Sequence, residues 1–220
     1  MPRNSRIVVP GIPHHVTQRS NKGNDIFFTR EDRLFFLEQL KKYAELTGLE
    51  VVSYCLMTNH THLIVIPREK DSLARAFKPL HLIFSQRHNN QTLAKGLNWQ
   101  GRFYSSPMDE PHAYRAIQYV ILNPLRAGIC NRIEDYEWSS ARAHLGKITS
   151  SVLSAEKRWL YIAQQAVSNI KDQELSEESA RMISRHTRRN LPIGSDVFVS
   201  MLEEKFGRTL RYRQRGRPWS

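Results

Sequence analysis

Cysteine is scarce in this chain: Cys55 and Cys130 are the only two among 220 residues. They form no Cys-x-x-Cys pair, which excludes a disulfide framework and suits a reducing compartment. No apolar run is long enough to cross a membrane, and the start, MPRNSRIVVPG, lacks the apolar stretch of a signal peptide. We therefore expect a soluble cytoplasmic protein with no membrane partner.

Acidic residues are also few compared with basic ones. The chain has 33 Lys and Arg against 21 Asp and Glu, a net charge of +12 and a pI near 10.0. Residues 181–220 alone hold ten Lys or Arg and three Asp or Glu, so more than half of the excess lies at this end. Such a balance indicates an anionic partner, usually nucleic acid, although a soluble protein can be basic for no such reason.

The hydrophobic pattern predicts strands and helices in the order strand, helix, strand, strand, helix, strand, helix. The expected segments are residues 12–19, 31–47, 49–57, 60–66, 72–88, 102–108 and 111–122. Thr29 should cap the first helix and Gly48 should end it, while Pro79 should kink or break the second. This order predicts an α+β fold with a ferredoxin-like antiparallel sheet and packed helices.

The character of the chain changes after Gly146. Helices are expected over residues 155–169, 177–186 and 195–206, followed by a loose basic tail. We therefore divide the chain into residues 1–146, which hold the predicted sheet, and residues 147–220, a C-terminal helical extension.

Two histidines stand at alternate positions of one predicted strand. Side chains alternate along a strand, so His60 and His62 point to the same face, about 7 Å apart along the backbone. Two imidazoles placed in this way can both reach one divalent metal ion. For an isolated His-x-His pair, two histidines with ordinary hydrogen bonds are the commoner explanation.

A tyrosine and an asparagine share a face of the last predicted helix of residues 1–146. Tyr119 and Asn123 are four residues apart, and the helix should stop near Pro124. Asn123 could offer its carbonyl oxygen to Mg²⁺ or Mn²⁺. A core tyrosine beside a polar helix end is the alternative. Together with the histidine pair, Tyr119 suggests phosphodiester cleavage with a tyrosine nucleophile.

Several segments resemble the REP-associated tyrosine transposases, a branch of the single-tyrosine HUH transposases. The matching segments are PGIPHHVTQRSNKGNDIF, MTNHTHLIVIP, WQGRFYSSPMDE, YVILNPLRAGI and DYEWSSARAHLG, which span most of residues 10–146. The resemblance implies the HUH endonuclease fold, a divalent metal on His60 and His62, a third ligand at Asn123 and a nucleophile at Tyr119. It also implies cleavage and rejoining of single-stranded or hairpin repeat DNA through a 5′-phosphotyrosine.

One position departs from the family pattern. The residue between the two histidines is normally a bulky hydrophobe, and here it is Thr61, which should point to the opposite face of the sheet. Its hydroxyl needs a partner if it is buried. Of the two histidines on the first strand, His14 and His15, one could face the site, although we favour a structural role.

Basic and aromatic residues supply candidate DNA contacts. Arg102, Arg115 and Arg126 are candidates for phosphate contacts. The tail residues Arg213, Arg215 and Arg217 lie in a segment that contains Arg-Gly-Arg-Pro and resembles an AT-hook. Trp99, Phe103 and Tyr104 could stack on unpaired bases or pack in the core.

Two other functions stay open at this point. The chain could be a domesticated protein that binds repeat DNA without cutting it, or a relaxase or replication initiator of the same superfamily. The intact set of His60, His62 and Tyr119 favours an enzyme, and YVILNPLRAG favours the transposase branch. A homodimer is conceivable, and the sequence does not choose between one copy and two.

Overall fold

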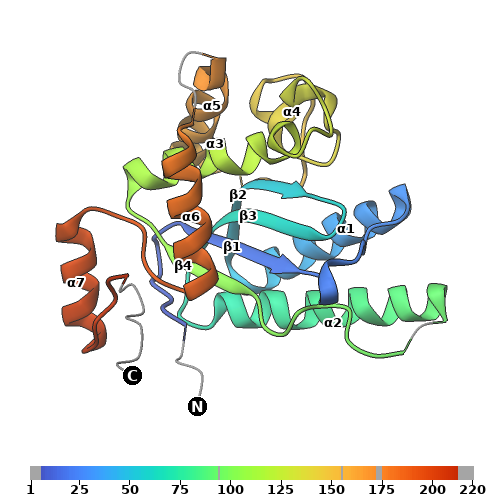
Figure 1. Ribbon diagram of the computed structural model, residues 1–220, viewed down its shortest axis with the longest axis horizontal. Coiled ribbons are helices and arrows are strands. Elements are labelled where there is room, and N and C mark those ends of the chain that lie inside the picture. Colours follow the sequence, from blue (N-terminus) through green and yellow to red (C-terminus); the bar gives the residue numbers. More distant parts are fainter. Residues whose placement is uncertain (1–5, 94, 155, 172–174, 213–220) are drawn as a thin grey trace, which may run out of the picture.

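The computed structural model describes residues 6–93, 95–154, 156–171 and 175–212, and a four-stranded sheet lies at its centre. The strands are β1 (His14–Arg19), β2 (Leu49–Leu56), β3 (His60–Pro67) and β4 (Tyr104–Pro107). Their order is β2-β3-β1-β4, and each neighbouring pair is antiparallel (Figure 1). This is the predicted ferredoxin-like sheet, and the described C-terminal residues form the predicted helical extension.

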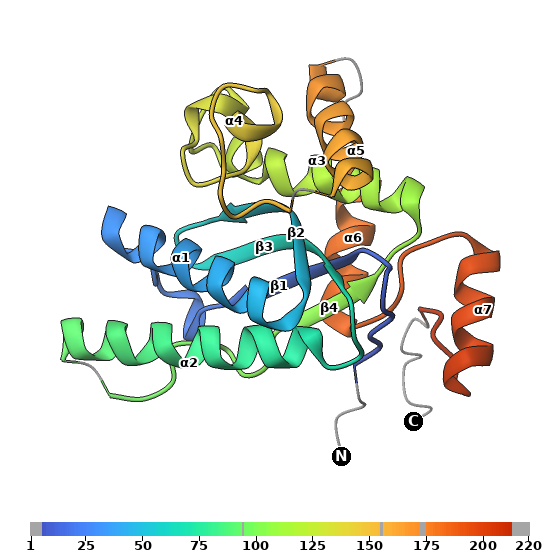
Figure 2. The ribbon, with the colours of Figure 1, turned by 180° about the vertical axis from the view of Figure 1, so that it is seen from behind.

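Helices cover both faces of the sheet (Figures 1 and 2). On one face lie α1 (Arg30–Thr47) and α2 (Ser72–Thr92), and on the other lie α3 (Glu110–Arg126), α5 (Lys157–Ser168) and α6 (Glu177–Arg189). The remaining helices are α4 (Ala141–His144), α7 (Asp196–Phe206) and three 3₁₀ turns at Asn21–Gly23, Ile133–Asp135 and Asn169–Lys171. In the described part of the chain, no helix is long and apolar enough to cross a membrane.

Helix α1 begins and ends where its sequence predicts. The Thr29 side chain accepts from the Asp32 N–H, and the Asp32 side chain accepts from the Thr29 N–H, which together make a capping box. Gly48 ends the helix in a left-handed conformation with φ of 62°, which glycine adopts without steric cost.

Two helices of the structure contain an internal proline. The sequence predicts a kink or a break at Pro79, and helix α2 is not broken there. Proline removes the hydrogen bond to the carbonyl four residues earlier, and that residue, Arg75, is exposed to water. Leu73 and Phe77, which flank Arg75, are buried and hold the helix on the core. Helix α3 continues past Pro124 and ends only two residues later, so the lost hydrogen bond lies in its final turns.

The sheet separates two hydrophobic cores. One core lies between the sheet and the pair α1 and α2, with Phe36, Phe77 and Phe84 among its fully buried side chains. The other joins β2 and β3 to α3, α5 and α6. Helices of the C-terminal extension therefore share a core with the helix that carries Tyr119. The division at residue 146 stays a prediction about the sequence.

Candidate active site

The structure brings the predicted histidine pair and the predicted tyrosine together. On β3, His60 and His62 lie opposite Arg19 and Thr17 of β1, and opposed residues of antiparallel strands share a face. Helix α3 packs on that face. The ring centroids of His60 and His62 are 4.9 Å apart, and those of His62 and Tyr119 are 5.4 Å apart.

A cavity of about 470 Å³ contains these side chains. Strands β1, β3 and β4 and helices α3 and α6 all contribute to its wall. The lining residues are His15, Thr17, Arg19, His60, His62, Gln100, Tyr104, Tyr119, Asn123, Ser184, Thr187 and Arg188. Four of the five elements come from residues 1–146, and α6 comes from the extension.

A chain of hydrogen bonds determines which nitrogen of His62 carries the proton. Thr187 Oγ1 donates its one proton to the carbonyl oxygen of Ile183 (2.8 Å), so it can only accept from His15 Nδ1 (2.8 Å). Burial lowers the pKa of His15 to about 3, so the ring is neutral and its Nε2 is an acceptor. This Nε2 is 2.9 Å from His62 Nδ1, which must donate. His62 therefore keeps the lone pair on Nε2.

The second histidine has the same tautomer for a different reason. The Asn59 amide nitrogen donates to the Gly23 carbonyl (2.9 Å), so its Oδ1 is the atom that faces His60 Nδ1 at 2.6 Å. His60 Nδ1 donates to it, and the lone pair again lies on Nε2. Burial, with the charges of Arg19 and Arg188, lowers the pKa of His60 to about 4 and keeps the ring neutral.

Asn123 also presents its acceptor atom. Its amide nitrogen donates to the Tyr119 carbonyl oxygen at 2.7 Å, one helical turn earlier. The other atom of the amide, Oδ1, is an acceptor and takes no part in this hydrogen bond. Neutral imidazole nitrogens and an amide oxygen suit a divalent metal such as Mn²⁺ or Mg²⁺. Within the described ranges no group of three His, Cys, Asp or Glu could hold a metal. Asn123, the third ligand that the family resemblance implies, lines the same cavity as the two histidines.

Tyr119 is 8% exposed, and its surroundings shift the pKa of its phenol in opposite directions. Burial raises the pKa of its phenol above the ordinary value of 10.0. A hydrogen bond with Ser184 and the positive charges of Arg188 and Arg126 act in the opposite sense, because each favours the phenolate. The phenol is therefore protonated at neutral pH, and the groups around it can stabilise the charge that develops when the proton leaves.

A basic groove of about 620 Å³ leads along α6 to Tyr119. Its lining includes five arginines, namely Arg126, Arg181, Arg185, Arg188 and Arg189. Arg126, a predicted phosphate contact, forms an ion pair with Glu177 at 2.9 Å, so part of its charge is compensated. Arg115, another predicted contact, is exposed on α3 and lines neither this groove nor the cavity.

The other sequence-based candidates lie in different parts of the molecule. Trp99 and Phe103 are buried in the core beneath α1 and α2, whereas Tyr104 lines the cavity. His14 is structural as expected: Nδ1 donates to the Ile12 carbonyl at 2.7 Å, and Nε2 accepts from the Val9 N–H. The tail residues Arg213, Arg215 and Arg217 lie outside the described residues.

Sequence reasoning missed the contribution of α6. Ser184, Thr187 and Arg188 enter the cavity from a helix that begins more than fifty residues after Tyr119. Their spacing of three and four residues places them on one helical face, and this is the signal that the sequence contains. The partner of His15 is Thr187, 172 positions away, and no local pattern predicts that contact.

Comparisons with known proteins agree with this architecture. The family model for IS200-like transposases matches residues 9–122, more than half of the chain, so the chain belongs to this family. The match includes His60, His62 and Tyr119, and it ends one residue before Asn123. No curated protein shows a significant match to the chain.

Two solved structures are similar to the chain. A REP-associated tyrosine transposase bound to a REP hairpin matches with a TM-score of 0.53 and 16% identity, over 71% of this chain and 93% of that chain. At this identity the match establishes the fold alone. A protein from Deinococcus radiodurans R1 matches with a TM-score of 0.38 and 16% identity, over 61% of this chain and 98% of that chain, and this likeness supports no argument.

Proposed function

We propose that this transposase is a metal-dependent nuclease that cleaves and rejoins single-stranded or hairpin repeat DNA through a 5′-phosphotyrosine at Tyr119. The observation that carries the proposal is the set of acceptor atoms around that tyrosine. His60 Nε2, His62 Nε2 and Asn123 Oδ1 each keep a lone pair because their neighbouring atoms are fixed by hydrogen bonds. The REP hairpin in the structurally similar transposase supports hairpin DNA as the substrate class.

In this mechanism His60, His62 and Asn123 would hold Mg²⁺ or Mn²⁺. A divalent ion there supplies Lewis-acid polarisation of the scissile phosphate and helps to orient it. The chain itself supplies the nucleophile, the tautomers of the two imidazoles and the positive charge around the reacting phenol.

The chemical step exchanges one phosphate ester for another. The Tyr119 oxygen attacks phosphorus and loses its proton, and the bond from phosphorus to the 3′-oxygen breaks. The leaving oxygen takes up a proton to become a free 3′-hydroxyl, while the 5′-phosphate stays on the tyrosine. Attack by a 3′-hydroxyl on this ester reverses the step, joins the strand and releases Tyr119. Arg188 and Ser184 oppose the effect of burial on the pKa of the phenol, which assists its deprotonation.

The basic groove gives the DNA a path to the tyrosine. Arg181, Arg185 and Arg188 line it together with Tyr119. Arginine binds phosphate through paired N–H donors, and a row of them along a helix suits a nucleic-acid backbone. The alternative, a protein that binds repeat DNA without cutting it, needs this groove but has no use for two histidines with oriented lone pairs.

Incubation with labelled hairpin DNA and Mn²⁺ tests the proposal through a covalent protein–DNA adduct. Tyr119→Phe should abolish the adduct and leave DNA affinity within about twofold, because it removes one oxygen and little packing surface. If the variant forms as much adduct as the unaltered protein, another residue is the nucleophile.

Substitution of the histidines tests the metal separately. His60→Ala and His62→Ala should each lose Mn²⁺-dependent cleavage and bind Mn²⁺ more weakly in a direct titration. The circular dichroism spectrum should stay unchanged, because both side chains line a cavity. Full activity in both variants would show that the metal, if any, binds elsewhere.

A further inference from the structure

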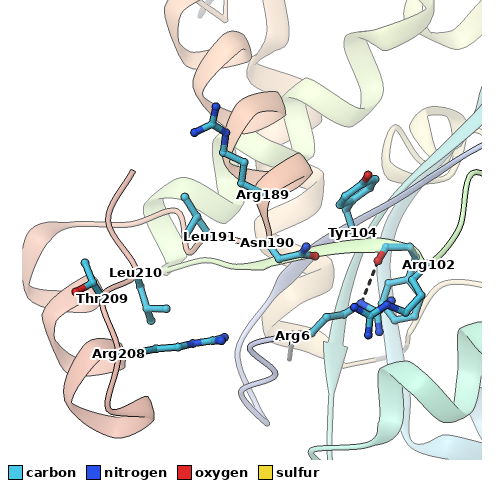
Figure 3. A pocket seen from close by; sticks show the side chains of 10 residues that line it. Arg6, Arg102, Tyr104, Arg189, Asn190, Leu191, Arg208, Thr209 and Leu210 are labelled. Atoms are coloured by element: carbon cyan, nitrogen blue, oxygen red, sulfur yellow. Dashed lines mark hydrogen bonds between the residues drawn. The ribbon is translucent and has the colours of Figure 1, made fainter. Parts of the chain in front are cut away.

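A second cavity, of about 340 Å³, shares Tyr104 with the cavity that contains the histidines. Four chain segments form its wall: the N-terminal segment before β1, the start of β4, the end of α6 and the segment after α7. Four of its ten lining residues are arginines, Arg6, Arg102, Arg189 and Arg208, and none of the ten is acidic. Figure 3 shows Arg208 extending its guanidinium toward Arg6 and Arg102, while Arg189 points away from them.

Arg6 is held in this cavity by uncharged groups. Its Nε donates to the Phe103 carbonyl oxygen at 3.0 Å, the contact drawn in Figure 3, and its guanidinium carbon lies 3.7 Å from the centre of the Phe103 ring. Burial, and then the nearby charge of Arg102, lower the pKa of Arg6 to about 10. The protein thus holds the Arg6 cation beside a second cation at a cost to its charged form, and a bound anion would offset that cost.

The cavity adjoins the candidate active site and the basic groove. Tyr104 lines both this cavity and the one with the histidines, and Arg189 lines both this cavity and the groove along α6. A strand that reaches Tyr119 through the groove can therefore also meet the arginines of the adjoining cavity. This continuity favours a phosphate within a longer DNA strand over a small free anion.

We propose that this arginine cavity binds a backbone phosphate of the substrate strand, separate from the phosphate that Tyr119 attacks, and so anchors the strand in register. The inference rests on the proposed function for the identity of the ligand. Arg6 and Arg102 are the residues assigned to this phosphate. Because Arg6 is fixed on Phe103 before DNA arrives, little side-chain freedom is lost when the phosphate binds.

The test uses DNA binding in a Tyr119→Phe background, where the strand stays intact. Arg102→Gln removes one charge from an exposed side chain, so folding is preserved. Arg132→Gln is the matched control, since Arg132 is exposed and ion-paired with Glu134. It lines neither of the two cavities nor the basic groove. Binding is measured by fluorescence anisotropy at several salt concentrations. The oligonucleotides carry one uncharged methylphosphonate linkage, moved one position at a time.

Arg102→Gln should weaken binding about five- to tenfold and reduce the slope of log affinity against log salt by about 0.7. A methylphosphonate at one position should weaken binding to the Tyr119→Phe parent. The same methylphosphonate should not weaken binding to the Arg102→Gln variant any further. Arg132→Gln should match the parent throughout. Unchanged affinity and slope in Arg102→Gln, or equal effects of every linkage in both proteins, would overturn the proposal. So would calorimetric binding of inorganic phosphate that Arg102→Gln abolishes while DNA affinity stays the same.

The subsite and the cleavage chemistry can fail independently. If the protein forms its covalent adduct but the linkage scan shows no position specific to Arg102, the subsite alone is wrong. If no adduct forms but the scan finds such a position, the cleavage proposal is wrong and the phosphate subsite stands.

Discussion

Replacing Thr187 with valine should change the proton position on His62 without touching that residue. Valine keeps the shape of the fully buried threonine but cannot accept from His15 Nδ1. The His15 proton then either stays on Nδ1 without a partner or moves to Nε2. In the second case His15 donates to His62 Nδ1, the His62 proton moves to Nε2, and the lone pair assigned to the metal is lost.

The size of the effect follows from the cost of an unsatisfied buried donor. That cost is about 1–3 kcal/mol, and metal binding must restore the unfavourable tautomer. At about 1.4 kcal/mol per factor of ten, Mn²⁺ affinity should fall about 5- to 150-fold, which agrees with the usual effect of removing a partner of a metal ligand. Imidazole ¹H–¹⁵N correlation spectra of the metal-free protein should show His62 protonated on Nδ1 in the parent and on Nε2 in Thr187→Val.

Thr187→Ser is the control, because it keeps the hydroxyl and should retain both the parent tautomer and the parent affinity. If Thr187→Val leaves the His62 tautomer and the Mn²⁺ affinity unchanged, the hydrogen bonds from Thr187 through His15 do not determine the tautomer of His62.

Three further outcomes follow from other parts of the structure. Thr61→Val should raise the free energy of unfolding by about 1 kcal/mol in urea melts, because the Thr61 hydroxyl is buried with no partner among the described residues, and a loss of stability would contradict this. Deleting residues 213–220 should reduce the slope of log DNA affinity against log salt by about 2 if the three arginines of this segment contact a single strand. Cleavage at saturating protein should be retained. An unchanged slope would show that the tail takes no part in DNA binding. Acid should destabilise the protein below about pH 6.5, because burial lowers the pKa of His81 to about 3 and of His144 to about 4, and the unfolded chain then takes up protons that the folded chain does not. Each such histidine should cost up to about 1.4 kcal/mol per pH unit between pH 6.5 and its folded pKa, so urea melts at pH 7, 6 and 5 with equal midpoints would refute the assignment.

The sheet and its helices were predictable because their signals are local. Thr29 and Gly48 mark the ends of α1 through a capping box and a left-handed glycine, and both signals can be read within a few residues. The effect of Pro79 was harder to predict, because it depends on tertiary packing. The buried face of α2 compensates for one missing hydrogen bond, and a sequence does not reveal how much compensation is present.

The same distinction applies to the candidate site. Strand alternation alone places His60 and His62 on one face, and the structure agrees. The roles of these two residues, of Tyr119 and of Asn123 stay predictions. For His15 the sequence favours a structural role, but this residue lines the cavity. Its function depends on which side chain meets its other nitrogen, and that side chain belongs to α6. Contacts across 172 positions arise from the packing of α6 on β4 and β1, which no local pattern specifies.

The late position of α6 also has a consequence for how the protein is made. Synthesis proceeds from the N-terminus, so His60, His62, Tyr119 and Asn123 leave the ribosome well before Thr187. Until α6 has emerged and packed, the growing chain holds the four residues assigned to catalysis. It lacks the hydroxyl that fixes the His62 tautomer and the four groove arginines that α6 supplies. A nascent or prematurely terminated chain would thus match the family in sequence but lack part of the site that the proposed cleavage needs. The order of synthesis itself would delay the proposed cleavage until α6 is in place.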